Sequence, residues 1–333
     1  MFRVKADVTI DQKKIKAIIT RDYDLEVIAL ERVRAVYKVY TDKGTYGFKN
    51  AEELPDLPFI ADCLQQIKKN GFNRIPHLLF SKQGELLVHE DGESYFMEHW
   101  LKLRELPSHS LPHFTEIGSA LAHFHEASCG ISKPDSNNPR SQWGTHHSFL
   151  IKSKKLLDRW QQDDRYKDDT ETWLLRFLRY RCEMALHFIQ TAPQDAQYGV
   201  WCHNALQHRN LMLDDSNEVW LIDFETLAYR ERVWDLAHFL EYHARPLDWH
   251  PHACQLFLNT YQVSVKTPIQ QQEWNLFFSY LAFPKRLYRR MKRYFGVNNP
   301  GSSQLNRFVK TVKREMTKEP CFQTLYTHLV QSE

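Results

Sequence analysis

The sequence predicts an α+β fold of two lobes, a small lobe rich in β-strands followed by a larger helical lobe. Two observations carry this prediction. Segments in which apolar and polar residues alternate are concentrated before Trp100, whereas nearly all of the chain after it has the periodicity of amphipathic helices. With 333 residues, of which 42% are hydrophobic, the chain can also bury a large core. We therefore expect the lobes to span residues 1–98 and 99–333, joined near residues 97–103.

The first lobe begins with a predicted β-hairpin that ends in Lys49. Val33–Val39 and Thr45–Lys49 alternate apolar and polar residues around the turn Thr41–Gly44. A helix is expected over Leu57–Asn70, because apolar residues recur there at a helical period until Asn70-Gly71, a pair that can end a helix in left-handed conformation. Three more strands are predicted after this helix, at Ile75–Ser81, Glu85–His89 and Ser94–Trp100.

The second lobe is predicted to be helical around one further hairpin. Amphipathic patterns indicate three helices, at Phe114–Ala127, Ser148–Gln161 and Glu171–Gln190. The segment Cys129–Gly144 is rich in Ser, Asn and Pro and is typical of a loop. The hairpin comes next, with Leu211–Leu213 and Val219–Ile222 as strands and Asp214–Asn217 as the turn. The rest is expected to be helical, apart from a turn at Asn298–Gly301.

Composition excludes several classes of protein. The net charge is only +3, so bulk charge does not indicate nucleic-acid binding. No apolar run approaches the length of a membrane span, and the first residues lack the apolar core of a secretory signal, so we expect a cytosolic protein. Six widely spaced cysteines without a Cys-x-x-Cys pair indicate reduced, buried thiols. The seventeen histidines form no zinc motif.

The most informative stretch is the loop His203–Asn210, with the sequence His-Asn-Ala-Leu-Gln-His-Arg-Asn, followed by the hairpin and by Asp223-Phe224-Glu225. Pairing of the hairpin strands would bring Asn210 and Asp223 to the same end of the hairpin. Amide and carboxylate oxygens placed in this way suit a magnesium ion. An acid that directly follows an apolar strand also favours a site over an ordinary solvated carboxylate.

These features resemble the aminoglycoside phosphotransferase and choline kinase branch of the bilobal protein-kinase-like fold. Within that branch the sequence is similar to the bacterial spore coat protein S family, which includes YutH-like and YsxE-like proteins. The resemblance covers nearly the whole chain and rests on motifs in a fixed order: Lys49, Asn70–Phe72, Ile75-Pro76, Leu121–His125, His203–Asn210, Asp223–Glu225, Trp234–Ala237 and Phe283–Lys285.

The resemblance implies a nucleotide site in the first lobe. Lys49 would hold the phosphates of ATP, with a carboxylate of the following helix as its partner. Asp62 is the preferred partner and Glu53 the alternative, while an exposed lysine and solvated acids are the simpler interpretation. Met97 and His99, in the connection between the lobes, would complete the nucleotide site.

The resemblance also implies a metal site and a supporting loop. Asn210, Asp223 and Glu225 would bind magnesium, although Glu225 could instead support the loop. His203 is expected to be a scaffold residue of the loop rather than a proton carrier. Asp235 is expected to cap or brace the same loop.

Two departures from the family pattern indicate impaired catalysis. The family has His-x-Asp in this loop, and its aspartate is the base for the acceptor hydroxyl, whereas this chain has Ala205. A positioned base contributes ~10²–10⁴-fold to a rate, so its loss would cripple transfer without abolishing nucleotide binding. Glu31–Ala35 also lacks the glycine that lets a backbone approach phosphates closely, although Arg32 or Arg34 could reach them by side chain.

A basic segment bears on partners. Six basic residues are interleaved with apolar and aromatic ones: Lys285, Arg286, Arg289, Arg290, Lys292 and Arg293. On a helix they would form a basic face opposite an apolar face. A solvated helix face is the simpler interpretation, and a docking surface for an anionic partner is the alternative. No recognised nucleic-acid module accompanies it.

Three hypotheses follow. The resemblance implies a pseudokinase with a structural or assembly role in the bacterial endospore coat, made in the mother-cell cytoplasm and partnered by other coat proteins. Such a protein would need no cofactor. The alternatives are an active kinase that uses ATP and magnesium on an amino alcohol, a sugar or a homoserine-like acceptor, and a module that senses ATP. Ala205 disfavours the active kinase, and the missing glycine disfavours the sensor.

Overall fold

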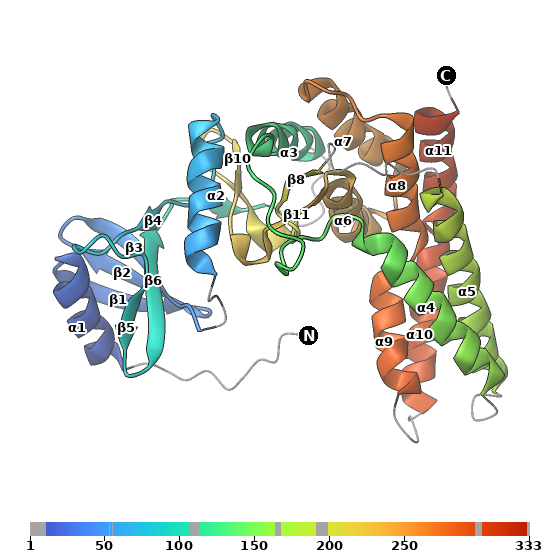
Figure 1. The fold of residues 1–333 in the computed structure, drawn as a ribbon, viewed down its shortest axis with the longest axis horizontal. Coiled ribbons are helices and arrows are strands. Elements are labelled where there is room, and N and C mark those ends of the chain that lie inside the picture. The colour runs from blue at the N-terminus through green and yellow to red at the C-terminus, as the bar shows by residue number, and fades with distance from the viewer. Residues whose placement is uncertain are drawn as a thin grey trace. The chain divides into compact units, whose positions relative to one another are not determined.

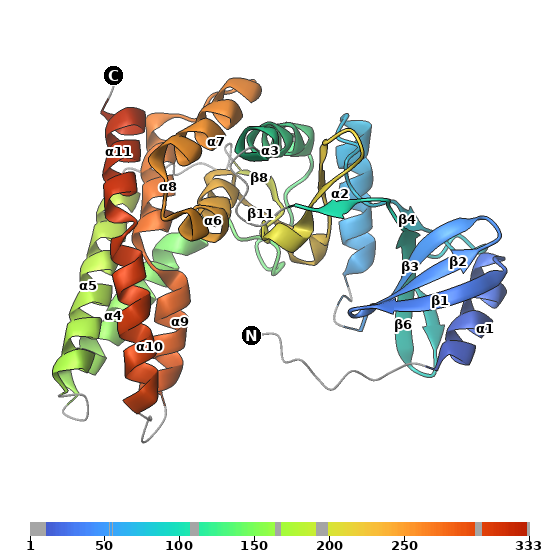
Figure 2. The same ribbon diagram turned by 180° about the vertical axis from the view of Figure 1, so that it is seen from behind.

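A computed structural model describes residues 11–52, 54, 56–106, 113–163, 168–190, 199–296 and 302–331. The chain divides into two compact units (Figures 1 and 2). The first consists of Met1–Arg104 with Met212–Glu225, and the second of Glu105–Leu211 with Thr226–Glu333. The predicted α+β class is confirmed. The first unit ends six residues later than the predicted boundary at residue 98, and it also takes in the hairpin that we had assigned to the helical lobe.

The first unit is built on one antiparallel sheet with the strand order β1-β2-β3-β6-β4, in which β5 also pairs with β6. Its elements are α1 (Gln12–Tyr23), β1 (Val27–Val33), β2 (Val36–Thr41), β3 (Gly44–Asn50), α2 (Leu57–Lys69), β4 (Leu78–Leu79), β5 (Val88–Glu90) and β6 (Glu93–His99). The predicted hairpin is β2–β3, whose register pairs Thr41 with Gly44. The predicted helix over 57–70 is α2, and strands occur in all three segments predicted after it: the short β4 and β5, and the seven-residue β6.

Two elements at the start of this unit were not predicted, α1 and β1. The sequence carries a signal for α1, because Asp11 caps it by accepting a hydrogen bond from the backbone amide of Lys13. Ile15, Ile18 and Ile19 then follow at helical spacing. β1 pairs with β2 up to Val33 and Val36, so Arg34-Ala35 forms the tight turn between the two strands.

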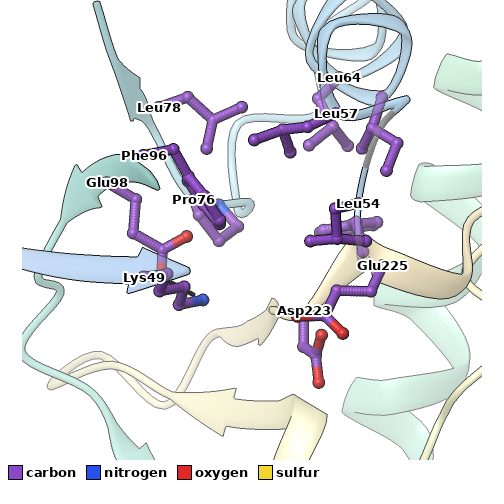
Figure 3. A pocket seen from close by; sticks show the side chains of 12 residues that line it. Lys49, Leu54, Leu57, Leu64, Pro76, Leu78, Phe96, Glu98, Asp223 and Glu225 are labelled. Carbon is purple, nitrogen blue, oxygen red and sulfur yellow. Dashed lines mark ion pairs between the residues drawn. The ribbon is translucent and has the colours of Figure 1, made fainter. Parts of the chain in front are cut away.

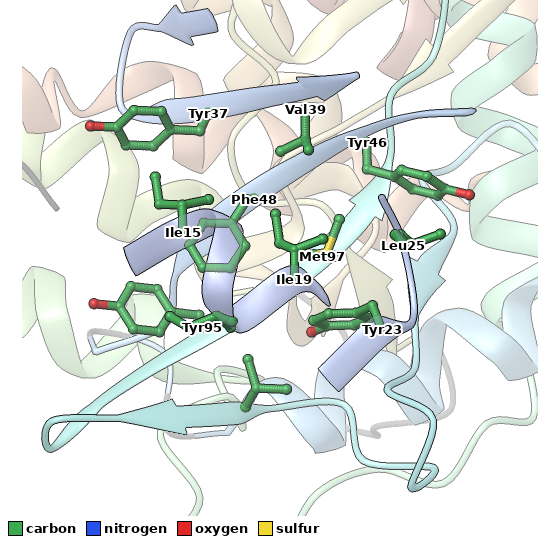
Figure 4. Close-up of a cluster of buried hydrophobic side chains, with 12 residues drawn as sticks. Ile15, Ile19, Tyr23, Leu25, Tyr37, Val39, Tyr46, Phe48, Tyr95 and Met97 are labelled. Carbon is green, nitrogen blue, oxygen red and sulfur yellow. The ribbon is translucent and has the colours of Figure 1, made fainter. Parts of the chain in front are cut away.

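Side chains of β6 alternate between two faces of the sheet, and each face has its own helix. Phe96 and Glu98 face α2, on the side that holds the pocket described below (Figure 3). Met97 faces α1 and belongs to a closed apolar core (Figure 4). In that core Ile15 and Ile19 of α1 pack against the strands. Full burial of each such side chain stabilises the fold by ~1.5–3 kcal/mol.

The predicted hairpin is formed by β9 (Leu211–Leu213) and β10 (Val219–Leu221), in a three-stranded sheet with the order β10-β9-β7, where β7 is Arg104–Glu105. Contacts with Arg74 attach the hairpin to the first unit. The backbone amide of Leu221 donates to the carbonyl of Arg74 at 3.0 Å, and the Arg74 guanidinium pairs with Glu218 at 3.0 Å. The residues that follow β10 are therefore placed by the first unit.

The second unit is helical, with one two-stranded sheet. Its main elements are α3 (Phe114–Ser128), α4 (Thr145–Gln162), α5 (Asp169–Ile189), β8 (Gly199–Cys202), β11 (Ala228–Glu231), α6 (Val233–His243), α7 (Pro251–Ser264), α8 (Gln271–Ala282), α9 (Lys285–Phe295), α10 (Ser302–Met316) and α11 (Glu319–Val330). The three predicted helices correspond to α3, α4 and α5. The pair β8–β11 was missed because four-residue strands carry little periodicity. The turn predicted at Asn298–Gly301 lies outside the described residues.

Close packing of α3 against α7 shows how tightly the second unit is assembled. A Cβ atom on Gly118 would lie 2.7 Å from the carbonyl oxygen of Phe257, so only glycine allows this approach. All six cysteines are free, and five of them are buried. In the described part of the chain, no helix has the length and apolar character needed to cross a membrane.

Candidate functional site

Four charged side chains converge on one pocket of the first unit (Figure 3). Lys49 comes from β3, Glu98 from β6, and Asp223 and Glu225 from the segment after β10. The walls of the pocket are apolar and are formed by Leu54, Leu57, Ile60, Leu64, Pro76, Leu78, Phe96 and Phe224. An apolar pocket with a few convergent polar groups is the usual form of a small-molecule site.

The ammonium group of Lys49 is paired with a carboxylate. Its Nζ atom lies 2.7 Å from Oε1 of Glu98, and the two side chains are 20% and 18% exposed. Burial by itself lowers the pKa of Lys49, but Glu98, with smaller contributions from Asp223 and Glu225, outweighs burial and raises the pKa above its usual value. Lys49 is therefore a firmly charged cation among three acids.

Asp223 and Glu225 place two carboxylate groups at the same pocket. Figure 3 shows both carboxylates turned into the pocket that also holds Lys49. Asp223 has a left-handed backbone, with φ 67°, a conformation that few residues other than glycine adopt. Carboxylate oxygens are the ligands that magnesium prefers, and a lysine ammonium suits phosphate. The donor set of the pocket thus fits a magnesium ion at Asp223 and Glu225 and a phosphate group at Lys49.

The partner of Lys49 differs from the one predicted. Asp62 is exposed on α2, where it accepts a hydrogen bond of 2.8 Å from Nε2 of Gln66. Glu98, which sequence reasoning missed, forms the ion pair instead. β3 and β6 are neighbouring strands, so their side chains on one face meet across the sheet, and this pairing cannot be read from the sequence alone. The alternative partner Glu53 lies outside the described residues.

The side chains of Met97 and His99 do not line this pocket, and their part in nucleotide binding stays a prediction. Met97 is fully buried in the core on the other face of β6. The ring of His99, two residues further on, lies 5.0 Å from the ring of Tyr46. Strand alternation explains the difference, because Phe96 and Glu98 take the pocket face and leave Met97 and His99 on the opposite one.

In the second unit, a buried carboxylate holds the loop His203–Asn210. Asp235 of α6 is fully buried and accepts hydrogen bonds from the backbone amides of His203 at 2.7 Å and Asn204 at 2.9 Å. Its Oδ2 atom also lies 3.3 Å from Nε2 of His125 on α3. The predicted bracing role of Asp235 is confirmed, and His203 is fully buried as a scaffold residue would be.

The carboxylate of Asp235 is engaged by the loop itself. Burial raises the pKa of this carboxyl, but the hydrogen bond to His125, with His203 and His238 nearby, outweighs burial and holds the pKa below its usual value. Both oxygens are already engaged by backbone amides of the loop. The carboxylate is thus committed to holding the loop.

Other contacts keep the loop in shape around Ala205. The Nδ2 group of Asn210 donates to the carbonyl oxygen of Ala205 at 2.9 Å. The amide of Leu206 donates to Nδ1 of His238 at 3.3 Å, and Asn204 adopts φ 66°. Several hydrogen bonds thus hold the loop although the Ala205 side chain has no acceptor. Asn210 and Asp223 belong to different units, and their placement side by side stays a prediction.

One buried group in the described residues has the spacing of metal ligands: His125, Cys202 and Asp235, whose ligand atoms lie within 4.8 Å of one another. Each of these groups has a protein partner. Nδ1 of His125 lies 2.8 Å from the hydroxyl of Tyr261, and Sγ of Cys202 donates to the carbonyl of Glu231 at 3.5 Å. Burial raises the pKa of Cys202 well above its usual value, so it remains a thiol. We interpret the group as support for the loop.

Arg230 is a residue of this region that sequence reasoning missed. It is 3% exposed, donates to Oδ1 of Asn204 at 3.1 Å, and stacks its guanidinium 3.8 Å from the ring centroid of Trp234. Lys285 places its Nζ atom 4.7 Å from the same ring, and burial, aided by Arg230, lowers the pKa of Lys285 to about 7. A buried arginine on a short strand gives no signal in the sequence.

The fold and the pocket define a protein of the kinase-like class that comprises aminoglycoside phosphotransferases and choline kinases. The chain belongs to the choline/ethanolamine kinase family, whose model matches residues 88–319. This match spans more than half of the chain and confirms the branch of the kinase-like fold that the sequence motifs resemble.

Individual known proteins are also similar to this chain in sequence or in fold. The chain is 23% identical over 211 residues to Spore coat protein S of Bacillus subtilis, a match that covers 62% of this chain and 59% of that protein, less than two thirds of its length. The aminoglycoside phosphotransferase of Alicyclobacillus acidocaldarius has the same fold, with a TM-score of 0.77 at 18% identity, over 95% of this chain and 96% of that one. Choline kinase LicA of Streptococcus pneumoniae also has this fold, with a TM-score of 0.54 at 17% identity, over 92% of this chain and 98% of that one.

Proposed function

We propose that this protein is a catalytically impaired member of its family, a pseudokinase with a structural or assembly role in the bacterial spore coat. The observation that carries the proposal is Ala205, which stands at the base position of a loop that is otherwise held in place. The similarity to Spore coat protein S supports the coat as its location and other coat proteins as its partners. Synthesis in the mother-cell cytoplasm is part of the same proposal.

Two features of the first unit support impaired catalysis. The segment before Lys49 forms a two-residue turn at Arg34-Ala35, which offers no glycine-rich backbone to nucleotide phosphates. Lys49 pairs at 2.7 Å with Glu98 of β6 and not with a carboxylate of α2, which departs from the pairing that the family resemblance implies. Neither feature depends on Ala205, and both depart from the ATP site that the resemblance implies.

Binding of a magnesium nucleotide without transfer is a second candidate function. Lys49, Asp223 and Glu225 converge on one pocket, and a spectinomycin phosphotransferase of similar fold was solved with ADP. Magnesium would supply the charge that holds the phosphates among these acids, which would otherwise repel them. Asp223 and Glu225 would orient the metal, and Lys49 would bind phosphate after separating from Glu98. Such a protein could sense ATP.

Genetic complementation tests the structural role. We would delete the gene, profile the coat proteins of purified spores, and restore the gene as wild type or as Asp223→Ala. We expect spores of the deletion strain to lack or misplace coat proteins. Both the wild-type gene and the Asp223→Ala gene should restore the coat, because a structural role needs no metal ligand. An unchanged coat in the deletion strain would refute the coat role. Rescue by wild type alone, with the variant folded and present, would indicate an enzyme.

A direct assay tests catalysis. Purified protein with ATP and magnesium would be offered amino alcohols, sugars and homoserine, with phosphorylated product measured by mass spectrometry. We expect turnover far below the ~1–100 s⁻¹ that is typical of kinases. Turnover in that range would establish the active phosphotransferase instead.

A further inference from the structure

Basic charge is concentrated in α9 and α10. Residues 285–316 carry ten Lys and Arg residues and a single acid, Glu315. The whole chain has a net charge of only +3, so the remainder of the chain is net acidic. The single acid of this segment is 5% exposed and pairs with Arg245 at 2.8 Å and Lys318 at 3.2 Å. Acidic residues of the same segment therefore do not neutralise the positive charge of the two helices.

The structure corrects the predicted basic face of α9. Its apolar side is buried, as predicted. Arg286, Arg289, Arg290 and Arg293 are exposed at i, i+3, i+4 and i+7, so they form one stripe about 10 Å long. Lys285 is not part of the stripe, because its ammonium group lies over the rings of Phe149 and Trp234.

α10 adds a second stripe that sequence reasoning missed. Figures 1 and 2 show α9 and α10 side by side, and the rings of Tyr294 and Phe308 meet between them at 5.5 Å. Phe308 and Val312 of α10 are buried. Its exposed positions include Arg307, Lys310, Lys313 and Arg314. We call the nine exposed residues the basic face: Arg286, Arg289, Arg290, Lys292, Arg293, Arg307, Lys310, Lys313 and Arg314.

Within the described part of the chain, no carboxylate forms an ion pair with a side chain of the basic face. The residues of the face also repel one another. Burial lowers the pKa of Arg290, and Arg286, Arg245 and Arg293 lower it further. An exposed, uncompensated cluster of this kind attracts anions over about one Debye length, ~8–10 Å.

We infer that the basic face docks a short acidic segment of a partner protein, rich in Asp and Glu. Six of its nine residues are arginines, whose planar guanidinium groups bind carboxylates in bidentate pairs. A long polyanion such as nucleic acid would extend beyond the face and meet a net acidic chain, whereas a short peptide would not. The choice of a protein partner rests on the proposed assembly role, while the surface itself does not.

Titration of an eight-residue glutamate peptide tests the inference. We would compare the full-length wild type with two variants, one carrying Arg286→Gln, Arg289→Gln, Arg290→Gln and Arg293→Gln, the other Arg307→Gln, Lys310→Gln, Lys313→Gln and Arg314→Gln. We expect each variant to bind about tenfold more weakly than wild type at ~0.1 M salt, and wild-type binding to weaken further as salt is raised. All substituted side chains are exposed, so thermal unfolding should be unchanged.

A matched control removes the same charge elsewhere. Four exposed lysines outside the basic face serve this purpose, as Lys16→Gln, Lys82→Gln, Lys133→Gln and Lys152→Gln. Its peptide affinity should stay within twofold of wild type. Equal loss in this control, no binding by wild type, or tighter binding of a DNA duplex of equal charge would each overturn the inference. The coat role fails separately, through an unchanged coat in the deletion strain.

Discussion

The pocket of the first unit and the loop of the second differ in the groups that they hold. The pocket gathers charged side chains, with Lys49, Asp223 and Glu225 turned into one space. The loop is held by the buried carboxylate of Asp235, and its Ala205 side chain has no hydrogen-bonding group. From the difference we predict that support and chemistry are separable: a change at Asp235 should affect folding, whereas a change at position 205 should affect turnover.

Restoring the base would test this separation most strongly. We expect Ala205→Asp to raise ATP turnover by ~10²-fold over wild type, because the surrounding loop is already held by Asp235 and Asn210 and a positioned base contributes ~10²–10⁴-fold to a rate. Product phosphorylated from ATP and magnesium, with the amino alcohols, sugars and homoserine of the direct assay as acceptors, measures it. Ala205→Asn, similar in size but without a base, is the matched control and should remain at the wild-type level. If the aspartate variant gains nothing, the pocket and not the loop limits catalysis.

Removing the support should damage folding rather than chemistry. We expect Asp235→Ala to lower the free energy of unfolding by ~3–5 kcal/mol. The substitution leaves the backbone amides of His203 and Asn204, and the ring of His125, without their hydrogen-bond acceptor. Urea denaturation followed by circular dichroism measures the change. The control Asp62→Ala removes an exposed carboxylate and should change stability by less than ~0.5 kcal/mol. A loss as small as that of the control would mean that Asp235 does not hold the loop.

The role of Glu98 in the pocket can be tested by removing its negative charge next to Lys49. We expect Glu98→Gln to tighten the binding of magnesium and ATP several-fold, up to ~10-fold, because the ammonium group no longer has a competing carboxylate at 2.7 Å. Lys49→Met should remove the binding that wild type has. Isothermal titration calorimetry measures both variants. Weaker binding by Glu98→Gln would show that Glu98 positions Lys49 for phosphate instead of competing with it.

A further prediction concerns pH and the loop. Burial lowers the pKa of His238 to about 4. Between pH 6.5 and 4, His238 is therefore protonated in the unfolded chain but neutral in the native protein. Stability therefore falls as pH drops through this window, and His238 should contribute on the order of 2 kcal/mol to the fall. His238→Asn keeps an acceptor for the amide of Leu206 but cannot titrate. Urea denaturation at pH 7 and pH 4.5 should show a smaller loss for the variant; an equal loss would refute the assignment.

Local patterns predicted much of the fold and part of the site. The β2–β3 hairpin, α2, α3, α4 and α5 follow from periodicity and turn residues, which act over a few positions. Asp235 as the brace of the loop followed from the family motif. α1 was missed despite its cap at Asp11, and the pair β8–β11 was too short to show a period.

The sequence by itself determined the class of the protein, the order of its motifs and the alanine at position 205, because these depend on which residues stand at particular positions. Only the tertiary structure decided which side chains meet. It paired Lys49 with Glu98 instead of Asp62, buried Met97 in the core, and packed α10 beside α9. The physical reason is that strand neighbours and helix contacts join residues far apart in the chain, where no local pattern records the pairing.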